Sequence, residues 1–211
     1  ARPWPDLLEA ELGLPCVNLG CVNAGIDSFL GEPDLLAVAA SARLTVVQAM
    51  GAQNLSNAHY RVHPRRNDRF LGPTPLMRRV FGDTDFTEFD FTRHMIGALE
   101  RRRPDRFAAL REGLRKTWLA RMTELVRRIE GPVVLLWFGW TPPPTPPCAA
   151  HAPEPLFVDR AMIDALRPHL AGVVEASIGA QARADGTRGM VFPEMEAPAA
   201  AALPGPRAHL E

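Results

Sequence analysis

The sequence predicts an α/β domain in which parallel strands form the middle layer of a three-layer sandwich. Two apolar runs, over residues 44–50 and 133–138, predict strands of the central sheet. The second run is apolar without interruption, which is typical of a parallel strand covered on both faces. Helical patterns alternate with these runs along the chain, and such alternation favours a parallel sheet.

Length, composition and charge are those of an ordinary globular domain. The chain has 211 residues, of which 46% are hydrophobic, and its 24 basic residues balance 24 acidic ones. We therefore expect one domain over residues 1–211, and neither a nucleic acid nor a membrane as partner. The chain contains three cysteines, too few and odd in number for a disulfide framework, and lacks an apolar run long enough to cross a membrane. These features favour a cytoplasmic protein.

Helix and turn signals define the first part of the chain. Residues 5–13 have the pattern of an amphipathic helix that ends at a glycine, and residues 16–19 predict a strand. A glycine-rich turn follows over 20–25, and residues 33–42 predict a helix with a proline in its first turn. Because an α/β domain usually begins with a strand, we expect the first strand of the sheet to be missing before residue 1.

The middle of the chain interrupts this alternation. Residues 55–81 are arginine-rich and irregular, and residues 85–130 predict two helices divided at Pro104. We interpret residues 55–130 as a helical insertion, or lid, over the strand ends. The second of its helices, over 105–130, has a buried face with spacings of three and four residues, formed by Phe107, Leu110, Leu114, Trp118, Met122, Leu125 and Ile129.

Proline and apolar patterns define the last part of the chain. Residues 142–153 are too rich in proline for a regular element, so we expect a loop there. Residues 157–178 predict the last clear helix, and residues 189–192 predict a short fourth strand.

Small and polar residues follow the predicted strands. Because parallel sheets bind ligands beyond the carboxyl ends of their strands, these residues are the candidates for a site. The candidate residues are Gly20, Asn23 and Gly25 after the first strand, Gly51, Gln53, Asn54 and Asn57 after the second, and Gly139 and Trp140 after the third.

Two of these segments resemble conserved blocks of a hydrolase family. Residues 17–20 (Val-Asn-Leu-Gly) and 51–54 (Gly-Ala-Gln-Asn) resemble, in order and placement, the second and third blocks of the SGNH, or GDSL-type, hydrolases. The resemblance implies a flavodoxin-like sheet, and it implies that Gly20 and Asn54 are donors of an oxyanion hole. In addition, residues 17–25 and 63–70 resemble an uncharacterised bacterial family of unknown function.

The same resemblance implies where the remaining catalytic groups belong. The nucleophilic serine of those enzymes ends the first strand, so we expect the nucleophile to lie outside this chain. His209 takes the place of the closing histidine, although no aspartate stands three residues before it. The sequence also differs from the family in having one extra residue between glycine and asparagine. We expect esterase or acyl-transfer activity on a small or carbohydrate-linked ester.

A cluster of arginines supports an alternative function. Arg65, Arg66 and Arg69 follow the second strand within a few residues of one another. Guanidinium groups bind carboxylate, sulfate or phosphate in a bidentate manner. The alternative is therefore a noncatalytic α/β domain that binds a small, anionic ligand through this cluster.

Three other sequence patterns concern metals, cofactors and the nucleophile. His59 and His63 are four residues apart, but Pro64 follows and no third ligand is evident, so we expect no metal. The glycine-rich motifs that bind nucleotide phosphates are absent from the sequence, and we expect no other cofactor. The order Asp27-Ser28 imitates part of the SGNH nucleophile motif but follows the second block instead of preceding it.

Overall fold

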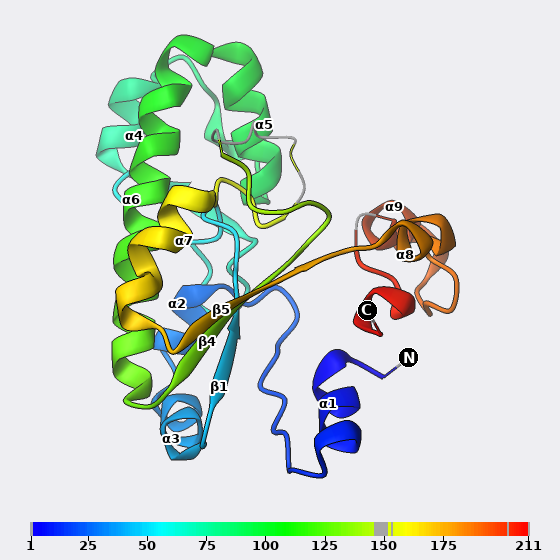
Figure 1. Cartoon of the computed structure of the whole chain (residues 1–211). Helices are drawn as coiled ribbons and strands as arrows, with labels where there is room; N and C mark the ends of the chain where they lie inside the picture. The colour runs from blue at the N-terminus through cyan, green and yellow to red at the C-terminus, as the bar shows by residue number, and fades with distance from the viewer. Residues whose placement is uncertain (1, 146–151, 153, 202, 211) are drawn as a thin grey trace.

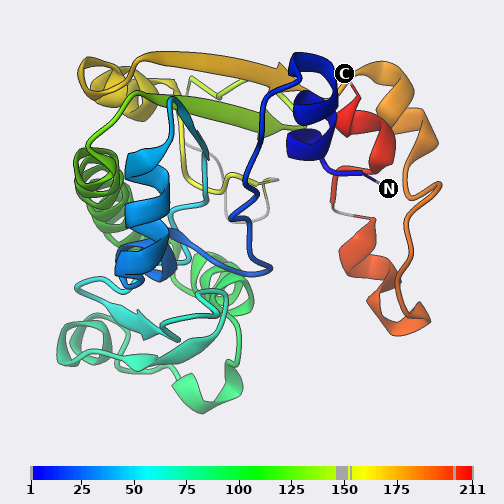
Figure 2. The same cartoon turned by 90° about the horizontal axis from the view of Figure 1, so that it is seen from below.

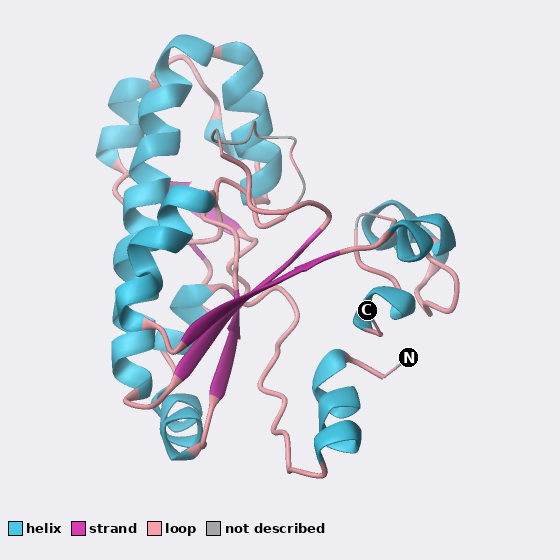
Figure 3. Cartoon of the chain, viewed as in Figure 1, coloured by secondary structure: helices cyan, strands magenta, loops and turns pink. Residues whose placement is uncertain are grey.

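The structure is a computed structural model that describes residues 2–145, 152, 154–201 and 203–210. Within these residues it is a mixed α/β protein with a parallel sheet and a small antiparallel hairpin (Figures 1 and 3). The elements in chain order are α1 (Trp4–Leu12), α2 (Ile26–Leu30), α3 (Pro33–Ser41), β1 (Thr45–Gln48), β2 (Tyr60–Val62), β3 (Phe70–Pro73), α4 (Pro75–Val80), η1 (Phe86–Glu88), α5 (Thr92–Arg102), α6 (Pro104–Ile129), β4 (Val133–Gly139), α7 (Arg160–Leu166), η2 (Arg167–His169), β5 (Gly172–Ser177), α8 (Ala180–Asp185), η3 (Glu194–Glu196), α9 (Ala197–Ala200) and η4 (Pro206–His209).

The parallel sheet has the order β1-β4-β5, with β4 in the centre. Thr45 of β1 pairs with Val133 of β4, and Val134 pairs with Gly172 of β5. The strands predicted at residues 44–50 and 133–138 are therefore confirmed. The central strand is the most buried of the three because it has a hydrogen-bonded neighbour on each side.

The hydrophobic core lies between this sheet and the helices on one of its faces, and it continues into the hairpin β2–β3, α4 and α5. Helices α2, α3, α6 and α7 lie on the same side of the sheet (Figure 1). The long helix α6 contacts the other three. All seven residues of the apolar face predicted for α6 are at most 3% exposed, which confirms that prediction. The predicted boundary at Pro104 is also confirmed, since α5 ends and α6 begins there.

The opposite face of the sheet is less completely covered. On β4, Val134 and Phe138 are only partly buried, whereas their neighbours Leu135 and Trp137 are buried in the core. Val174 of β5 is 52% exposed. Helix α1 and the C-terminal helices lie away from the core helices, beyond the sheet (Figure 2).

Three sequence predictions about regular structure are wrong. Residues 16–19 form an extended loop in which Val17 is 71% exposed, and residues 189–192 form another loop, with Val191 fully exposed. Neither segment pairs with a described strand, and an unpaired strand leaves its backbone groups without partners. The predicted helix over 157–178 is α7 and η2 followed by β5.

The predicted insertion contains more regular structure than expected. Residues 55–81, expected to be irregular, contain the hairpin β2–β3 and helix α4. Within the hairpin, Tyr60 and Phe70 are buried and their rings are 6.1 Å apart. The assignment of residues 55–130 as an insertion or lid stays a prediction. Residues 146–151 and 153 of the predicted proline-rich loop lie outside the described residues.

Candidate functional site

A rigid turn follows the carboxyl end of β1. Trp118, buried in α6, donates from Nε1 to the carbonyl of Met50 at 2.6 Å. Tyr60 donates from its hydroxyl to the carbonyl of Gln53 at 2.6 Å. Burial raises the pKa of Tyr60, so its hydroxyl keeps its proton and remains a donor. Contacts from α6 and β2 therefore fix the backbone that precedes Asn54.

The side chain of Asn54 is oriented by Thr92 at the start of α5. The Thr92 hydroxyl donates to Asn54 Oδ1 at 2.7 Å. Thr92 is buried, and its backbone N–H donates to the carbonyl of Asp68 at 2.9 Å. With Oδ1 occupied, Asn54 Nδ2 has no acceptor within the part of the chain that the structure describes. The Thr92 hydroxyl thus sets the direction of the Asn54 amide group.

Asn67 fastens the glycine-rich loop against this turn. Its Oδ1 accepts from the N–H of Gly25 at 2.8 Å and from the Ser28 hydroxyl at 2.9 Å. Its Nδ2 donates to the carbonyl of His63 at 2.7 Å. A Cβ at position 25 would lie only 2.7 Å from the carbonyl oxygen of Asn54, so the close approach of these segments requires glycine.

The structure thus places Gly25 against Asn54, whereas Gly20 is exposed on the loop that precedes it. The N–H of Gly20 donates to Asn18 Oδ1 at 2.9 Å, so this amide could reach a ligand only after leaving Asn18. Asn23 has a left-handed φ of 61°. Its carbonyl accepts from the N–H of Asn67 at 3.0 Å. The ligand-binding roles of Gly20 and Asn23 stay predictions.

A polar cluster lies beside Gly51, and the sequence indicates only one of its three members, Gln53. Gln53 Nε2 donates to Glu154 Oε1 at 2.6 Å, and Arg93 Nη1 donates to the same oxygen at 2.7 Å. A methyl group on Gly51 would overlap Gln53 Oε1 and Glu154 Oε2, so glycine is required for these two oxygens to lie where they do. We call Gln53, Arg93 and Glu154 the strand-end cluster.

The remaining predicted residue of this turn has a structural role in the described chain. Asn57 Oδ1 accepts from the backbone N–H groups of His59 and Tyr60 at 2.8 and 3.2 Å. Its Nδ2 donates to the carbonyl of Leu55 at 2.8 Å. Asn57 therefore closes the turn, and ligand binding through it stays a prediction.

The three predicted anion-binding arginines have three different partners. Arg65 Nε lies 3.4 Å from Glu32 Oε1, and Arg66 Nη2 lies 3.7 Å from Asp68 Oδ2. The guanidinium of Arg69 lies 5.4 Å from the centre of the Phe91 ring. These contacts hold the guanidinium groups on separate partners, and an anion site that combines them stays a prediction.

His209 belongs to a small apolar cluster near the carboxyl ends of β4 and β5. Its ring centre lies 5.3 Å from that of Phe138, and the neighbouring Ala208 packs with Ile178 and Ala182. His209 Nδ1 is buried and has no hydrogen-bond partner among the described residues. Burial lowers the pKa of His209, which favours the neutral ring that a general base requires.

Replacing His209 with glutamine is expected to reduce the loss of stability in acid. Because burial lowers its pKa from an ordinary value of 6.5, the unfolded chain binds more protons than the folded chain as the pH falls below that value. The free energy of unfolding should then decrease between about pH 7 and about pH 5, and less so in His209→Gln. His59, whose pKa burial also lowers, accounts for part of the remaining slope. Urea unfolding at both pH values measures the difference, and equal slopes in the parent and the variant would contradict it.

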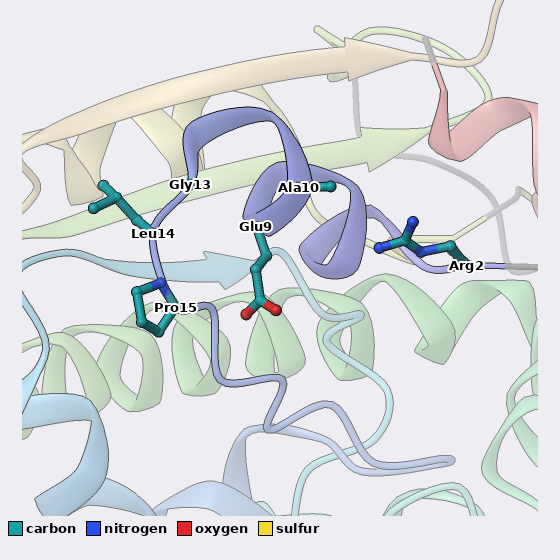
Figure 4. A pocket seen from close by; sticks show the side chains of 6 residues that line it. All are labelled: Arg2, Glu9, Ala10, Gly13, Leu14 and Pro15. Carbon is teal, nitrogen blue, oxygen red and sulfur yellow. The ribbon is translucent and has the colours of Figure 1, made fainter.

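An open pocket of about 460 Å³ lies elsewhere, along α1 and the turn that follows it (Figure 4). It is lined by Arg2, Glu9, Ala10, Gly13, Leu14 and Pro15. Glu9 Oε2 accepts from the N–H of Cys16 at 2.7 Å, which ties this helix to the loop. The strand-end residues that carry the predicted chemistry do not line this pocket.

Two further properties concern metals and membranes. Within the described ranges, no group of three or more histidine, cysteine, aspartate or glutamate side chains is arranged to bind a metal ion. The helices in the described part of the chain also include none that is both long and apolar enough to span a bilayer.

The sequence indicates part of this site and misses part of it. Asn54 and the turn around it follow from the strand-then-glycine pattern, whereas Thr92, Arg93 and Glu154 come from distant segments with no pattern of their own. Among the residues of the strand-end cluster, the sequence indicates only Gln53, because it is next to Asn54.

Comparison with known proteins identifies a family. No curated protein and no solved structure matches this chain. The profile described as Domain of unknown function (DUF6473) matches residues 1–211, and the chain therefore belongs to that family.

Proposed function

We propose that this protein acts in ester hydrolysis or acyl transfer, and that Asn54 donates a hydrogen bond to the oxyanion that forms during the reaction. The observation that carries the proposal is the bond from Thr92 to Asn54 Oδ1. It leaves the amide nitrogen as the ligand-facing group of a side chain that cannot rotate freely. Preorganised neutral donors of this kind stabilise the tetrahedral intermediates of acyl transfer.

The position of Asn54 also supports the proposal. It lies in the turn after β1, at the carboxyl end of a parallel strand, where sheets of this class bind ligands. The flavodoxin-like topology of the SGNH enzymes is part of the same proposal, because in those enzymes the asparagine follows a strand in this way. Gly20 would be the second donor after its amide leaves Asn18.

The reaction requires a nucleophile that the nearby serines do not supply. The Ser28 hydroxyl donates to Asn67 Oδ1, and it lies 3.1 Å from the carbonyl of Pro64. The hydroxyl oxygen of Ser56 accepts from the N–H of Val62 at 3.1 Å. Both hydroxyl groups are therefore used within the fold. We assign His209 to the base and the nucleophile to a group other than these two serines.

Replacement of Asn54 with alanine is expected to lower kcat for p-nitrophenyl acetate about a hundredfold, because one oxyanion donor is lost. Thr92→Val should lower kcat less, about tenfold, since the Asn54 amide remains but is free to turn. The measurements are steady-state turnover and labelling with a fluorophosphonate probe, both on the intact gene product. Gln181→Ala changes an exposed amide on α8 and serves as the matched control.

Absence of both turnover and labelling in the folded protein would refute this proposal. Inorganic phosphate then provides the second measurement, because the arginine cluster is the alternative site. Phosphate binding that is lost in Arg66→Ala, without labelling, would support a noncatalytic, anion-binding domain.

A further inference from the structure

Helix α1 carries exposed leucines with acidic residues on both sides. Leu8 and Leu12 are one helical turn apart, so they share a face of the helix, and Leu12 is 59% exposed. With about 3.6 residues per turn, Glu9 and Glu11 fall on opposite sides of the leucine pair, and both are exposed. The helix therefore presents an apolar stripe that is bordered by negative charge.

The same helix is loosely attached to the rest of the protein. Pro5 is its only buried residue, and no other helix or strand of the described chain packs extensively against it. The linker over residues 14–24 contains no helix or strand and is mostly exposed. A linker of this length spans up to about 40 Å when it is extended, so α1 can reach well beyond its place in the structure.

The solvent side of the hairpin β2–β3 has the complementary pattern. Phe70 is buried, so its neighbours Arg69 and Leu71 lie on the other face of β3, and Leu71 is 59% exposed. Arg61, between two buried residues of β2, is exposed on the same face. Phe91 pairs with Arg69 through an isolated bridge and is 43% exposed. We call Arg61, Arg69, Leu71 and Phe91 the hairpin face.

The arginines of the hairpin face have no carboxylate partner. The guanidinium of Arg61 forms no ion pair or hydrogen bond with any residue that the structure describes. The guanidinium of Arg69 lies against the Phe91 ring, 5.4 Å from its centre. Unpaired guanidinium groups beside exposed apolar side chains favour a partner that supplies both carboxylates and apolar residues. Helix α1 is a segment of this chain with that composition.

We propose that α1 of one copy of the protein binds the hairpin face of a second copy. Leu8 and Leu12 pack against Leu71 and Phe91, and Glu11 pairs with an arginine of the hairpin face. The contact is an amphipathic helix bound to a surface of complementary charge. Within one chain, α1 and the hairpin lie well apart (Figures 1 and 2), so the occupant is the helix of another copy. Exchange of α1 in both directions gives a symmetric dimer.

Sedimentation velocity over a range of protein concentrations tests this inference, which does not depend on the proposed function because association is measured without turnover. The parent is expected to dimerise at submillimolar concentration, and less tightly as added salt screens the charges. Glu11→Arg and Arg61→Glu each place like charges at the contact, so each should raise the dimer Kd by at least about tenfold. Lys116→Glu reverses an exposed charge on α6 and should leave the Kd unchanged.

Mixing the two charge-reversed proteins distinguishes a second copy from the helix of the same chain. In a mixed dimer the reversed helix meets the reversed hairpin face, and the two unchanged surfaces meet each other. Opposite charges then lie together at both contacts, so the mixture of Glu11→Arg and Arg61→Glu should dimerise about as tightly as the parent. Circular dichroism of each variant shows that it is folded before mixing.

A parent that stays monomeric at every concentration would overturn the inference, as would a dimer that neither charge reversal weakens. The inference also fails if the mixture does not dimerise although both variants are folded. A monomer in which the two reversals restore stability only when they are combined in one chain would show that α1 binds its own hairpin, and this result too would overturn the proposed exchange.

Discussion

Replacing Asn67 with alanine is expected to lower the free energy of unfolding by about 3–5 kcal/mol. The side chain is fully buried and accepts from the N–H groups of Gly25 and Ser28. Alanine would leave the N–H of buried Gly25 without its partner, which costs about 1–3 kcal/mol, while the N–H of Ser28 would keep only the carbonyl of Gly25 at 3.1 Å. It would also release the carbonyls of His63 and Pro64. Chemical denaturation monitored by tryptophan fluorescence measures the effect.

Asn18→Ala is the matched control for this prediction. Asn18 also accepts from a glycine N–H, that of Gly20, but it does so on an exposed local turn where water can replace the bond. Its removal should change the free energy of unfolding by less than about 0.5 kcal/mol. Similar effects for both asparagines would show that burial of the Asn67 network does not stabilise the fold as argued.

Replacing Asp159 with alanine is expected to cost about 3–5 kcal/mol for a different reason, because the largely buried Arg115 would keep only exposed Glu112, 3.4 Å from its Nε, as a partner. The Asp159 side chain is 2% exposed, and its Oδ2 pairs with Arg115 of α6. Its Oδ1 also accepts from the N–H of Met162 at 3.0 Å, so it caps α7. The substitution therefore removes both the link between α6 and α7 and the cap. Thermal and urea unfolding measure the loss.

Asp164→Ala on the same helix provides the comparison. Asp164 pairs with Arg167, and both side chains are 49% exposed. Exposed pairs of this kind contribute about 0–1 kcal/mol, so this variant should unfold almost like the parent. A further variant with both Asp159 and Arg115 replaced by apolar residues should recover part of the loss, because the largely buried charge of Arg115 is removed as well. Equal losses in Asp159→Ala and the double variant would contradict the buried-charge argument.

Local sequence patterns predict the central elements because the burial of each element depends on apolar residues that are close together in the chain. The apolar spacing of α6 and the continuous apolar run of β4 each depend only on the face that a segment presents to the core. The prediction of one helix over residues 157–178 is wrong because the apolar content of this segment suits a helix or a strand equally well. The proline in η2 and the glycine that begins β5 are the signals that divide this segment.

The candidate site could be predicted only where its residues are adjacent in the chain. The glycine and asparagine of the β1 turn are such a case. Thr92 orients Asn54 from 38 positions away, and Glu154 bonds Gln53 from 101 positions away. Side chains that come together only through tertiary folding have no characteristic spacing in the sequence.

The pairing of β1 with β4 also has a consequence for how the protein folds. The two strands are joined in parallel across the long segment that contains α5 and α6, and the turn after β1 takes its partners from that segment and from beyond β4. Closing so large a loop costs conformational entropy before the strand contacts repay it, so parallel pairing of distant segments is slow. The contacts of the candidate site can therefore assemble only at the end of folding. A partly folded chain would retain helix α6 but not the turn that holds Asn54, so an intact turn reports the native state.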